Sequence, residues 1–315
     1  MSEMKKTKSG LREPQSKRMT EAEVKGKIIE FAWNLKKNGY SEGTIRTYSN
    51  YLILLVKAGA YLLNPEEVKE VVAKKKWSEN TKFIVTNAYR AFLKFLGLTW
   101  KPPRYRQVLK IPFIPTEEEI NQLIAASGRK LAAFLMLLKE TGMRCGEALM
   151  LEWTDIDLQR RTVRITAEKG SYPRIMAISE DLTRALSLLP KNSAKIFPMT
   201  QSAMQHNLHK IRKEVAVKMN NPRLLKITFH TLRHWKGTME YHRTKDILHV
   251  KQLLGHRSIK STMLYINIDK ALFTVKSDEF HVKVASKPEE IKALLEVGFE
   301  YVCEKDGLMF FRKRK

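Results

Sequence analysis

Apolar positions recur at helical spacing throughout residues 20–98. Residues that show this spacing include Ile28, Ile29, Trp33, Val68, Val71, Val72, Tyr89, Phe92 and Leu93. Apolar residues three or four positions apart share one face of a helix, and that face can be buried against neighbouring helices. Gly39 ends the first helical segment, and Ser41 begins the second as an N-cap. The pattern therefore predicts four or five packed helices.

A proline-rich segment, residues 99–116, follows the helical region. It contains Pro102, Pro103, Pro112 and Pro115 together with four basic residues. Proline lacks a backbone donor and disrupts helices, so we expect an irregular interdomain linker. Thr116 is a predicted N-cap, because the acidic residues 117–119 after it suit the positive end of a helix dipole. Helical spacing then continues to Leu151.

Two short β-prone runs, Thr162–Thr166 and Ile175–Ile178, flank Gly170 and Pro173. Short strand-like runs separated by turn residues predict a small antiparallel hairpin. Helical spacing resumes near Ser179 and continues, with breaks, to about Tyr265.

The pattern changes again in residues 280–315. A β-prone run at His281–Val284 precedes a helical segment at Pro288–Leu295, and two further β-prone runs surround the pair Asp306-Gly307. Asp-Gly is a strong signal for a tight hairpin turn. The tail is therefore predicted to be a small β-α-β-β unit, which could cap the preceding domain or contact a neighbouring subunit.

The charge of the chain indicates its class of partner. Its 315 residues include 58 Lys and Arg against 33 Asp and Glu, a formal net charge of +25, which favours binding to a polyanion. A membrane surface is a poor alternative, because there is no apolar run of membrane-spanning length and no apolar signal segment in residues 1–20. We expect a soluble, cytoplasmic protein associated with the nucleoid and with no membrane partner.

Basic residues are concentrated in the first part of the chain. Residues 1–112 hold 23 Lys and Arg against 10 Asp and Glu, a net charge of +13. This favours a helical unit that grips a nucleic-acid backbone, with a solvated basic surface as the alternative. Residues 1–18 are expected to be a basic disordered arm, which either follows phosphates or is a solvated tail. Cys145 and Cys303 are too few for a disulfide framework or a CxxC zinc site, and both are predicted to be buried small residues.

Three segments place unusual combinations of residues together. They are Thr141-Gly142-Met143-Arg144-Cys145-Gly146-Glu147-Ala148-Leu149, then His230-Thr231-Leu232-Arg233-His234, then Leu254-Gly255-His256 with Tyr265 nine residues later. The three segments resemble, in order and spacing, the conserved boxes of the tyrosine recombinase (integrase) family. The resemblance covers roughly residues 113–270 by motif and extends more loosely to the helical N-terminal half.

Together the pattern and the resemblance predict a mainly α protein with a small antiparallel β-hairpin sheet and a small α+β C-terminal appendage. The resemblance implies a helical core-binding domain and a tyrosine-recombinase catalytic domain. The expected boundaries are a basic arm at 1–18, the core-binding domain at 19–98, a basic linker at 99–112, the catalytic domain at 113–279 and the β-α-β-β tail at 280–315.

The chemistry of the family explains why these side chains are needed. Cleaving a phosphodiester without a metal requires neutralisation of charge on the non-bridging oxygens, and guanidinium groups do this while staying protonated. The resemblance assigns this role to Arg144 and Arg233. His230 lies three residues before Arg233, hence on the same helix face, and is expected to contact the same phosphate and transfer protons. His256 follows Gly255, which allows a tight turn toward the site, and the resemblance implies that His256 donates a hydrogen bond to the phosphate.

The resemblance makes Tyr265 the nucleophile, which forms a phosphotyrosine that conserves the bond energy without ATP. It makes Lys169, in the predicted hairpin, the general acid for the leaving 5′ oxygen, although an exposed turn lysine would look the same in the sequence. Glu147 is interpreted as supporting a helix or an arginine, and His234 as structural. No cofactor and no metal ion are expected.

The implied function is that of a site-specific DNA recombinase or integrase of a mobile element, resembling integrases of archaeal viruses or plasmids. It would cut and rejoin double-stranded DNA through a 3′-phosphotyrosyl intermediate and a Holliday junction, as a homo-tetramer in the synaptic complex. The alternatives are DNA relaxation like that of a type IB topoisomerase, and DNA binding without catalysis.

Overall fold

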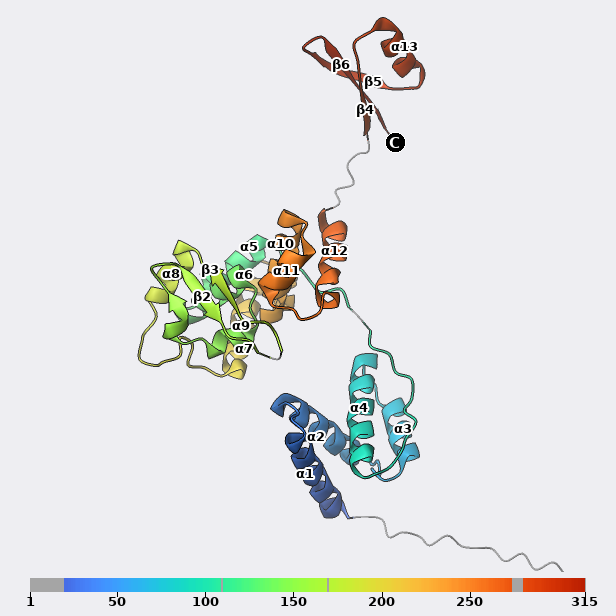
Figure 1. Cartoon of the computed structure of the whole chain (residues 1–315), viewed down its shortest axis with the longest axis vertical. Helices are drawn as coiled ribbons and strands as arrows, with labels where there is room; N and C mark the ends of the chain where they lie inside the picture. The colour runs from blue at the N-terminus through green and yellow to red at the C-terminus, as the bar shows by residue number, and fades with distance from the viewer. Residues whose placement is uncertain (1–19, 109, 169, 274–279, 315) are drawn as a thin grey trace, which may run out of the picture. The chain divides into compact units, whose positions relative to one another are not determined.

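The computed structural model describes residues 20–108, 110–168, 170–273 and 280–314 (Figure 1). Contacts within the chain separate one unit at residues 1–110 from a second at residues 111–315. Helices predominate in both, and the second unit also contains two small antiparallel sheets. The mainly helical class predicted from the sequence is confirmed. The predicted basic arm at residues 1–18 lies outside the described residues.

In its described residues, the first unit contains four helices. They are α1 (Glu21–Lys37), α2 (Glu42–Lys57), α3 (Pro65–Lys74) and α4 (Glu79–Phe95). Each begins at a capping residue whose side chain accepts a hydrogen bond from a free backbone N–H, and Ser41 is the cap of α2 as predicted. Their apolar faces meet in one core that includes Phe31, Leu52 and Phe92. Residues 99–108 and 110–115 form no helix or strand.

The second unit opens with three helices in the stretch where the sequence indicated continuous helical spacing. They are α5 (Glu117–Ala126), α6 (Arg129–Thr141) and α7 (Cys145–Met150). Thr116 caps α5 in a capping box with Glu119, as predicted. The stretch is divided because Gly128 is the N-cap of α6 and Gly142, at φ 60°, ends it in the left-handed conformation.

A three-stranded antiparallel sheet follows, after a short 3-10 helix η1 (Trp153–Asp155). Its strands β1 (Ile156–Asp157), β2 (Thr162–Ile165) and β3 (Arg174–Ala177) lie in the order β1-β2-β3. The predicted hairpin is β2 and β3, which pair with Val163 opposite Met176. Strand β1 was not predicted, because two residues are too few to show an alternating pattern.

Helices complete the main body of this unit. They are α8 (Glu180–Ser187), α9 (Gln201–Lys218), the 3-10 helix η2 (Pro222–Lys226), α10 (Phe229–Thr244), α11 (Ile247–Leu254) and α12 (Lys260–Phe273). Helix α10 packs against α6, α11 and α12, and edge-to-face contacts of Phe134 with Phe197 and Phe229 lie in the core. The motif residues on α10 therefore stand where three other helices meet.

The tail has the predicted β-α-β-β order. Its elements are β4 (Phe280–Ala285), α13 (Pro288–Glu296), β5 (Glu300–Lys305) and β6 (Leu308–Arg314), with the strands ordered β4-β6-β5. Asp306 and Gly307 have positive φ values of 54° and 74° and form the turn between β5 and β6. Ala285, Leu294, Phe299 and Phe311 make a separate small core.

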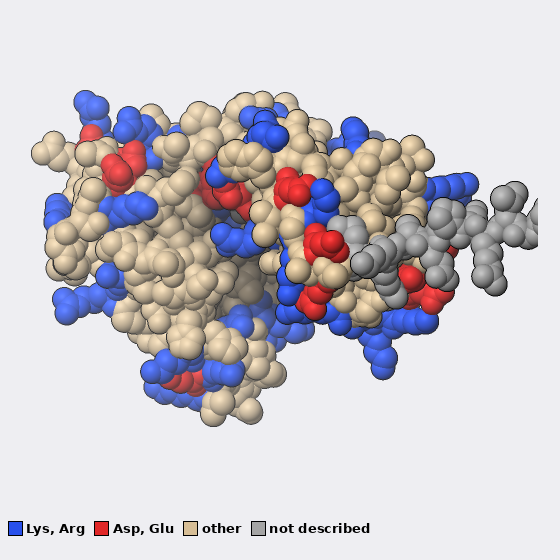
Figure 2. Space-filling model, turned by 90° about the horizontal axis from the view of Figure 1, so that it is seen from below, with Lys and Arg blue, Asp and Glu red and all other residues tan. Residues whose placement is uncertain are grey.

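The surface carries the basic excess of the sequence. Lys and Arg side chains are spread over much of the face drawn in Figure 2, where Asp and Glu are fewer. Within the described ranges, no helix is long and apolar enough to cross a membrane.

Candidate active site

The two buried hydrogen bonds of Arg233 bring the three motif segments together. Thr228 caps α10 and so sets His230 and Arg233 on its first turns. The Arg233 side chain is buried, with the residue 1% exposed, and its Nη1 donates to the Gly142 carbonyl at 2.7 Å. Its Nη2 donates to the Leu254 carbonyl at 2.6 Å. The guanidinium is therefore fixed by the turns that precede Arg144 and His256.

Arg144 is held by a buried carboxylate. It is the N-cap residue of α7, where its backbone N–H donates to Glu147 Oε2 at 2.9 Å and its Nη1 to Oε1 at 3.1 Å. Glu147 also accepts from Ser171 Oγ at 2.7 Å and from Arg174 Nη2 at 2.9 Å. Glu147 thus joins the first motif arginine to the end of the hairpin.

The electrostatics of Glu147 favour its charged form. Burial, the largest single effect, acts to raise the pKa of this carboxyl, but the hydrogen bond from Arg174 and the backbone N–H of Arg144 outweigh it. The net result is a pKa lowered to about 2. The carboxylate therefore stays ionised and keeps both arginines oriented.

The hairpin end lies against the turn after α11. Gly255, the C-cap of α11 at φ 67°, accepts at its carbonyl a hydrogen bond from the Tyr172 N–H at 3.1 Å. A Cβ at Gly255 would lie 2.9 Å from both the Tyr172 carbonyl oxygen and Arg174 Nη1, so only glycine fits. This contact brings the hairpin beside His256. Lys169, the predicted general acid, lies outside the described residues.

His256 is almost fully buried, at 9% exposure, and its Nδ1 lies 2.9 Å from Thr262 Oγ1. Burial, followed by the charges of Arg233 and Arg144, lowers the pKa of His256 to about 3. The ring is therefore neutral at neutral pH. A neutral imidazole carries one N–H. His256 can therefore donate a hydrogen bond from Nε2, the nitrogen that does not face Thr262, only in the tautomer protonated at Nε2.

Tyr265 lies on α12 and is 1% exposed. Burial raises the pKa of its phenol to about 12, against the opposing charges of Arg233 and Arg144. The hydroxyl lies 3.3 Å from Nδ1 of His234, the residue that follows Arg233 on α10. The phenol is therefore protonated in the free protein, and its oxygen faces a histidine.

Helix α12 is fastened to α10 one turn beyond Tyr265. Asp269 lies there and is buried. Its carboxylate accepts from His242 Nδ1 at 2.6 Å and from Lys245 Nζ at 2.6 Å. Burial acts to raise the pKa of Asp269, but the hydrogen bonds from Lys245 and His242 lower it overall. These contacts hold the tyrosine-bearing helix in register with α10.

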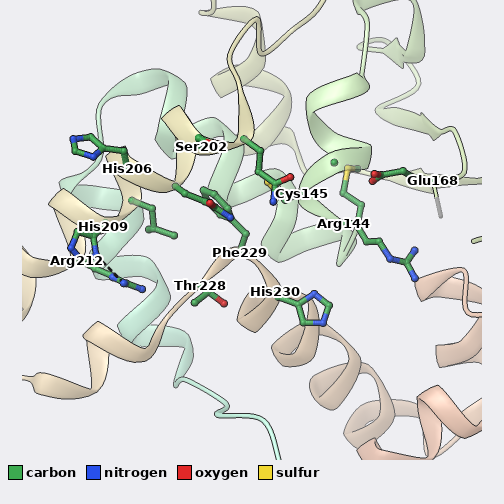
Figure 3. A pocket seen from close by; sticks show the side chains of 15 residues that line it. Arg144, Cys145, Glu168, Ser202, His206, His209, Arg212, Thr228, Phe229 and His230 are labelled. Carbon is green, nitrogen blue, oxygen red and sulfur yellow. Dashed lines mark hydrogen bonds between the residues drawn. The ribbon is translucent and has the colours of Figure 1, made fainter. Parts of the chain in front are cut away.

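A cavity of about 740 Å³ opens beside Arg144. It is lined by residues 143–146, the first turns of α9 and the start of α10, and Figure 3 shows Arg144 and His230 among its lining side chains. His230 is exposed here, yet desolvation by surrounding atoms, then the charges of Arg233 and Arg144, lower its pKa. A basic cavity of this kind suits an anionic group such as a phosphate.

The structure brings together five of the six predicted site residues. Arg144 and Arg233 are close enough for their charges to affect His230, His256 and Tyr265. The sequence did not indicate the contact of His234 with Tyr265, and His234 was interpreted as structural. The sequence also assigned no role to Gly237, which lies against the Tyr265 ring. A glycine inside a helix, three residues after a histidine, was the available signal.

The depressed histidine pKa values predict an acid-sensitive fold. The folded pKa values of about 4 for His234 and about 3 for His256 lie below the value of about 6.5 for an unfolded histidine. As pH falls below about 6.5, the unfolded chain binds protons that the folded chain does not, which costs about 1.4 kcal/mol per proton and pH unit. We expect the unfolding temperature of the DNA-free protein to fall from about pH 7 to about pH 5.

His256→Asn should weaken this dependence, because it removes one of the groups that titrate in the unfolded chain only. An unfolding temperature that stays constant across the same range, measured by calorimetry in buffers of matched ionic strength, would contradict the prediction.

Comparison with known proteins gives a consistent set of relatives. Residues 115–271 match the model of the phage integrase family. Tyrosine recombinase XerA of Pyrococcus horikoshii is 27% identical over 257 residues, which span 76% of this chain and 88% of the relative. Tyrosine recombinase XerA of Pyrococcus furiosus is 29% identical over 277 residues, 79% of this chain and 92% of the relative. The region that matches the family model, residues 115–271, contains all six predicted site residues.

Solved structures share the fold. A lambda integrase dimer bound to a COC′ core site has a TM-score of 0.60 and 15% identity, covering 80% of this chain and 79% of that chain. XerH site-specific recombinase bound to palindromic difH substrate, in a post-cleavage complex, has a TM-score of 0.56 and 21% identity. The match covers 78% of this chain and 86% of that chain. At these identities the likeness concerns the fold.

Proposed function

Because the chain belongs to the phage integrase family of tyrosine recombinases, we propose that it cuts and rejoins duplex DNA at specific sites with Tyr265 as its nucleophile. The activity class is that of its relatives, a site-specific DNA recombinase. The contacts of Arg233 carry the proposal for the site, since they join the turns before Arg144 and His256 to the helix that faces Tyr265. Such convergence of three distant segments is what phosphoryl chemistry at one point requires.

The proposed reaction is a transesterification. The Tyr265 oxygen attacks the phosphorus, a 3′-phosphotyrosyl bond forms, and the 5′ oxygen leaves. Arg144 and Arg233 stabilise the charge that develops on the non-bridging oxygens, with His230 and His256 as further hydrogen-bonding groups at the same phosphate. Lys169 is proposed to protonate the leaving 5′ oxygen. The free 5′ hydroxyl then attacks a phosphotyrosine on a second strand, and two such rounds pass through a Holliday junction.

Double-stranded DNA is the proposed substrate and binding partner. The lambda integrase and XerH structures of the same fold are complexes with DNA sites, and the net charge of +25 suits a polyanion. The affinity should fall steeply with salt as phosphate contacts release counterions. A homo-tetramer on two duplexes is the proposed assembly for strand exchange, because two duplexes together present four cleavage sites.

The test of this function uses a nicked suicide duplex that traps the covalent intermediate, together with a plasmid that carries two target sites. Wild-type protein should form a protein–DNA adduct that survives denaturation, with the 3′ phosphate joined to protein, and should yield recombinant plasmid products. Supercoil relaxation without any recombinant product would instead favour the topoisomerase-like alternative. Specific DNA binding without adduct would favour the inactive alternative.

Gly237→Ala is expected to slow DNA cleavage without unfolding the protein. A Cβ at Gly237 would lie 2.6 Å from Cζ of Tyr265, with two further ring carbons at 2.8 and 2.9 Å. The ring must therefore move away from α10, and a displacement of about 1 Å at a reacting group costs on the order of 10²-fold in rate. Alanine is also the better helix former by about 1 kcal/mol, which offsets part of the packing cost. Single-turnover cleavage of the suicide duplex measures the effect.

Gly26→Ala provides the matched control. Gly26 also lies within a helix, α1, but its Cβ would meet no atom within 4 Å. We expect unchanged cleavage and equal or higher thermal stability for this variant. Equal cleavage rates for Gly237→Ala and the wild type would show that the ring tolerates the added methyl group, contrary to the prediction.

A further inference from the structure

In the described part of the chain, the hydroxyl of Tyr265 forms a hydrogen bond with one side chain, that of His234. His234 Nδ1 lies 3.3 Å from Tyr265 Oη, and the two rings are 6.1 Å apart between centroids. Because Tyr265 is 1% exposed, bulk water does not surround the phenol. A buried hydroxyl can lose its proton only to a group within hydrogen-bond reach.

Two residues of helix α10 contact Tyr265. His234 and Gly237 stand one turn apart, so both face Tyr265, the first at its hydroxyl and the second against its ring. The absence of a side chain at Gly237 lets the ring lie close to the helix backbone, and the anchor of α12 through Asp269 keeps it there. The pairing of phenol and imidazole is thus supported from both helices.

We propose that His234 is a catalytic residue, the base that accepts the Tyr265 proton during cleavage and the acid that returns it during rejoining. The proposal rests on the proposed function, because it assigns a step of that same reaction. In cleavage, the O–H bond of Tyr265 breaks as its O–P bond forms, and the proton moves to Nδ1 of His234. The P–O5′ bond breaks, and the 5′ oxygen receives its proton from a separate donor. Rejoining reverses each transfer.

The state of His234 in the free protein suits this role. Burial, followed by the charges of His230 and Arg233, lowers the pKa of His234 to about 4, so the ring is neutral. In the tautomer protonated at Nε2, Nδ1 carries a lone pair toward the phenol. A phosphate bound at Arg144 and Arg233 adds negative charge nearby, which favours the imidazolium formed in the step. Formation of the O–P bond makes the phenolic proton more acidic as it is transferred.

The other histidines of the site are placed differently. Nδ1 of His256 is engaged by Thr262 at 2.9 Å. His230 packs edge-to-face on the His234 ring, with centroids 4.6 Å apart, and lines the open cavity. Within the described residues, the hydrogen bond to the hydroxyl of Tyr265 therefore comes from His234 and not from these two rings.

The first experiment measures single-turnover cleavage of the suicide duplex by full-length His234→Asn. Asparagine can still form a hydrogen bond with Tyr265 but cannot accept its proton. We expect cleavage to slow by on the order of 10²-fold or more, the usual contribution of a general base. His249→Asn is the control, because His249 contacts Glu240 on α10 at 3.0 Å and not the tyrosine. It should cleave at the wild-type rate.

Two chemical variants test whether His234 acts as the base for Tyr265. A substrate with sulfur at the bridging 5′ position needs no proton on its leaving group, so the His234→Asn defect should persist with it. A fluorinated tyrosine at position 265, introduced by nonsense suppression, has a more acidic phenol and should restore much of the rate of His234→Asn. The sulfur substrate thus distinguishes a base from a donor to the leaving group, and the fluorotyrosine distinguishes a base from a residue that only holds the ring in place.

The proposal is overturned by wild-type cleavage in His234→Asn, by a defect that the bridging sulfur relieves, or by a defect that fluorotyrosine leaves unchanged. Failure of the proposed function would look different, since wild-type protein itself would then form no adduct with either substrate.

Discussion

Tyr265→Phe is expected to abolish formation of the covalent protein–DNA adduct while the protein still folds and binds DNA. The change removes the attacking oxygen and nothing else, so no phosphotyrosine can form at this position. The loss of one hydrogen bond with His234 should cost only about 1 kcal/mol in the free energy of unfolding, and the ring keeps its buried packing with Val250, Leu254 and Ile268. Denaturing gels of the suicide reaction measure the adduct, and a mobility-shift titration measures DNA binding.

Tyr241→Phe is the matched control. Tyr241 lies on α10 and packs against the same apolar cluster as Tyr265. The same loss of a hydroxyl there should leave adduct formation at the wild-type level. An undiminished adduct in Tyr265→Phe would show that another side chain is the nucleophile, and peptide mapping of the DNA-linked fragment would identify it.

Local signals allowed much of the fold to be predicted. Ser41 and Thr116 are helix caps whose role depends on residues three positions away, and both begin helices in the structure. The Asp306-Gly307 pair forms its turn for a similar reason, since the required positive φ values belong to those residues themselves. Where the stretch from Thr116 to Leu151 was treated as continuous, the error came from underrating Gly128 and Gly142, which end or begin helices through backbone conformation.

The motifs and the family resemblance predicted a set of site residues but not their geometry. Motif spacing indicated that Arg144, Arg233 and Tyr265 act together, but no local pattern shows that an arginine will be buried and bonded to two carbonyls. The contact of His234 with Tyr265 joins residues 31 positions apart, and it depends on how α10 and α12 pack. The role of Gly237 follows only from that packing, because its missing side chain leaves room for the Tyr265 ring.

Three arginines of the described site, Arg144, Arg174 and Arg233, lie close to one buried carboxylate, Glu147. Glu147 pairs with Arg144 and Arg174, while Arg233 bonds backbone carbonyls, which carry no net charge. These four side chains therefore carry an excess of positive charge in a partly buried place. A phosphate bound as proposed would supply negative charge and should lower the cost of keeping the guanidinium groups desolvated. Burial first, and positive charge nearby second, keep His234 and His256 neutral in the free protein.

Arg233→Lys is expected to reduce cleavage by on the order of 10³-fold, the upper range for removal of one charge-stabilising donor. Lysine keeps the positive charge but lacks the planar fork of guanidinium, so it cannot bond the Gly142 and Leu254 carbonyls together while facing a phosphate. A buried carbonyl left without a donor should also lower the free energy of unfolding by about 1–3 kcal/mol. Arg223→Lys is the control, since Arg223 bonds both oxygens of Glu119 away from the motif residues; its cleavage rate should be that of the wild type. Wild-type cleavage by Arg233→Lys, measured at saturating protein on the suicide duplex, would show that charge alone is sufficient at this position.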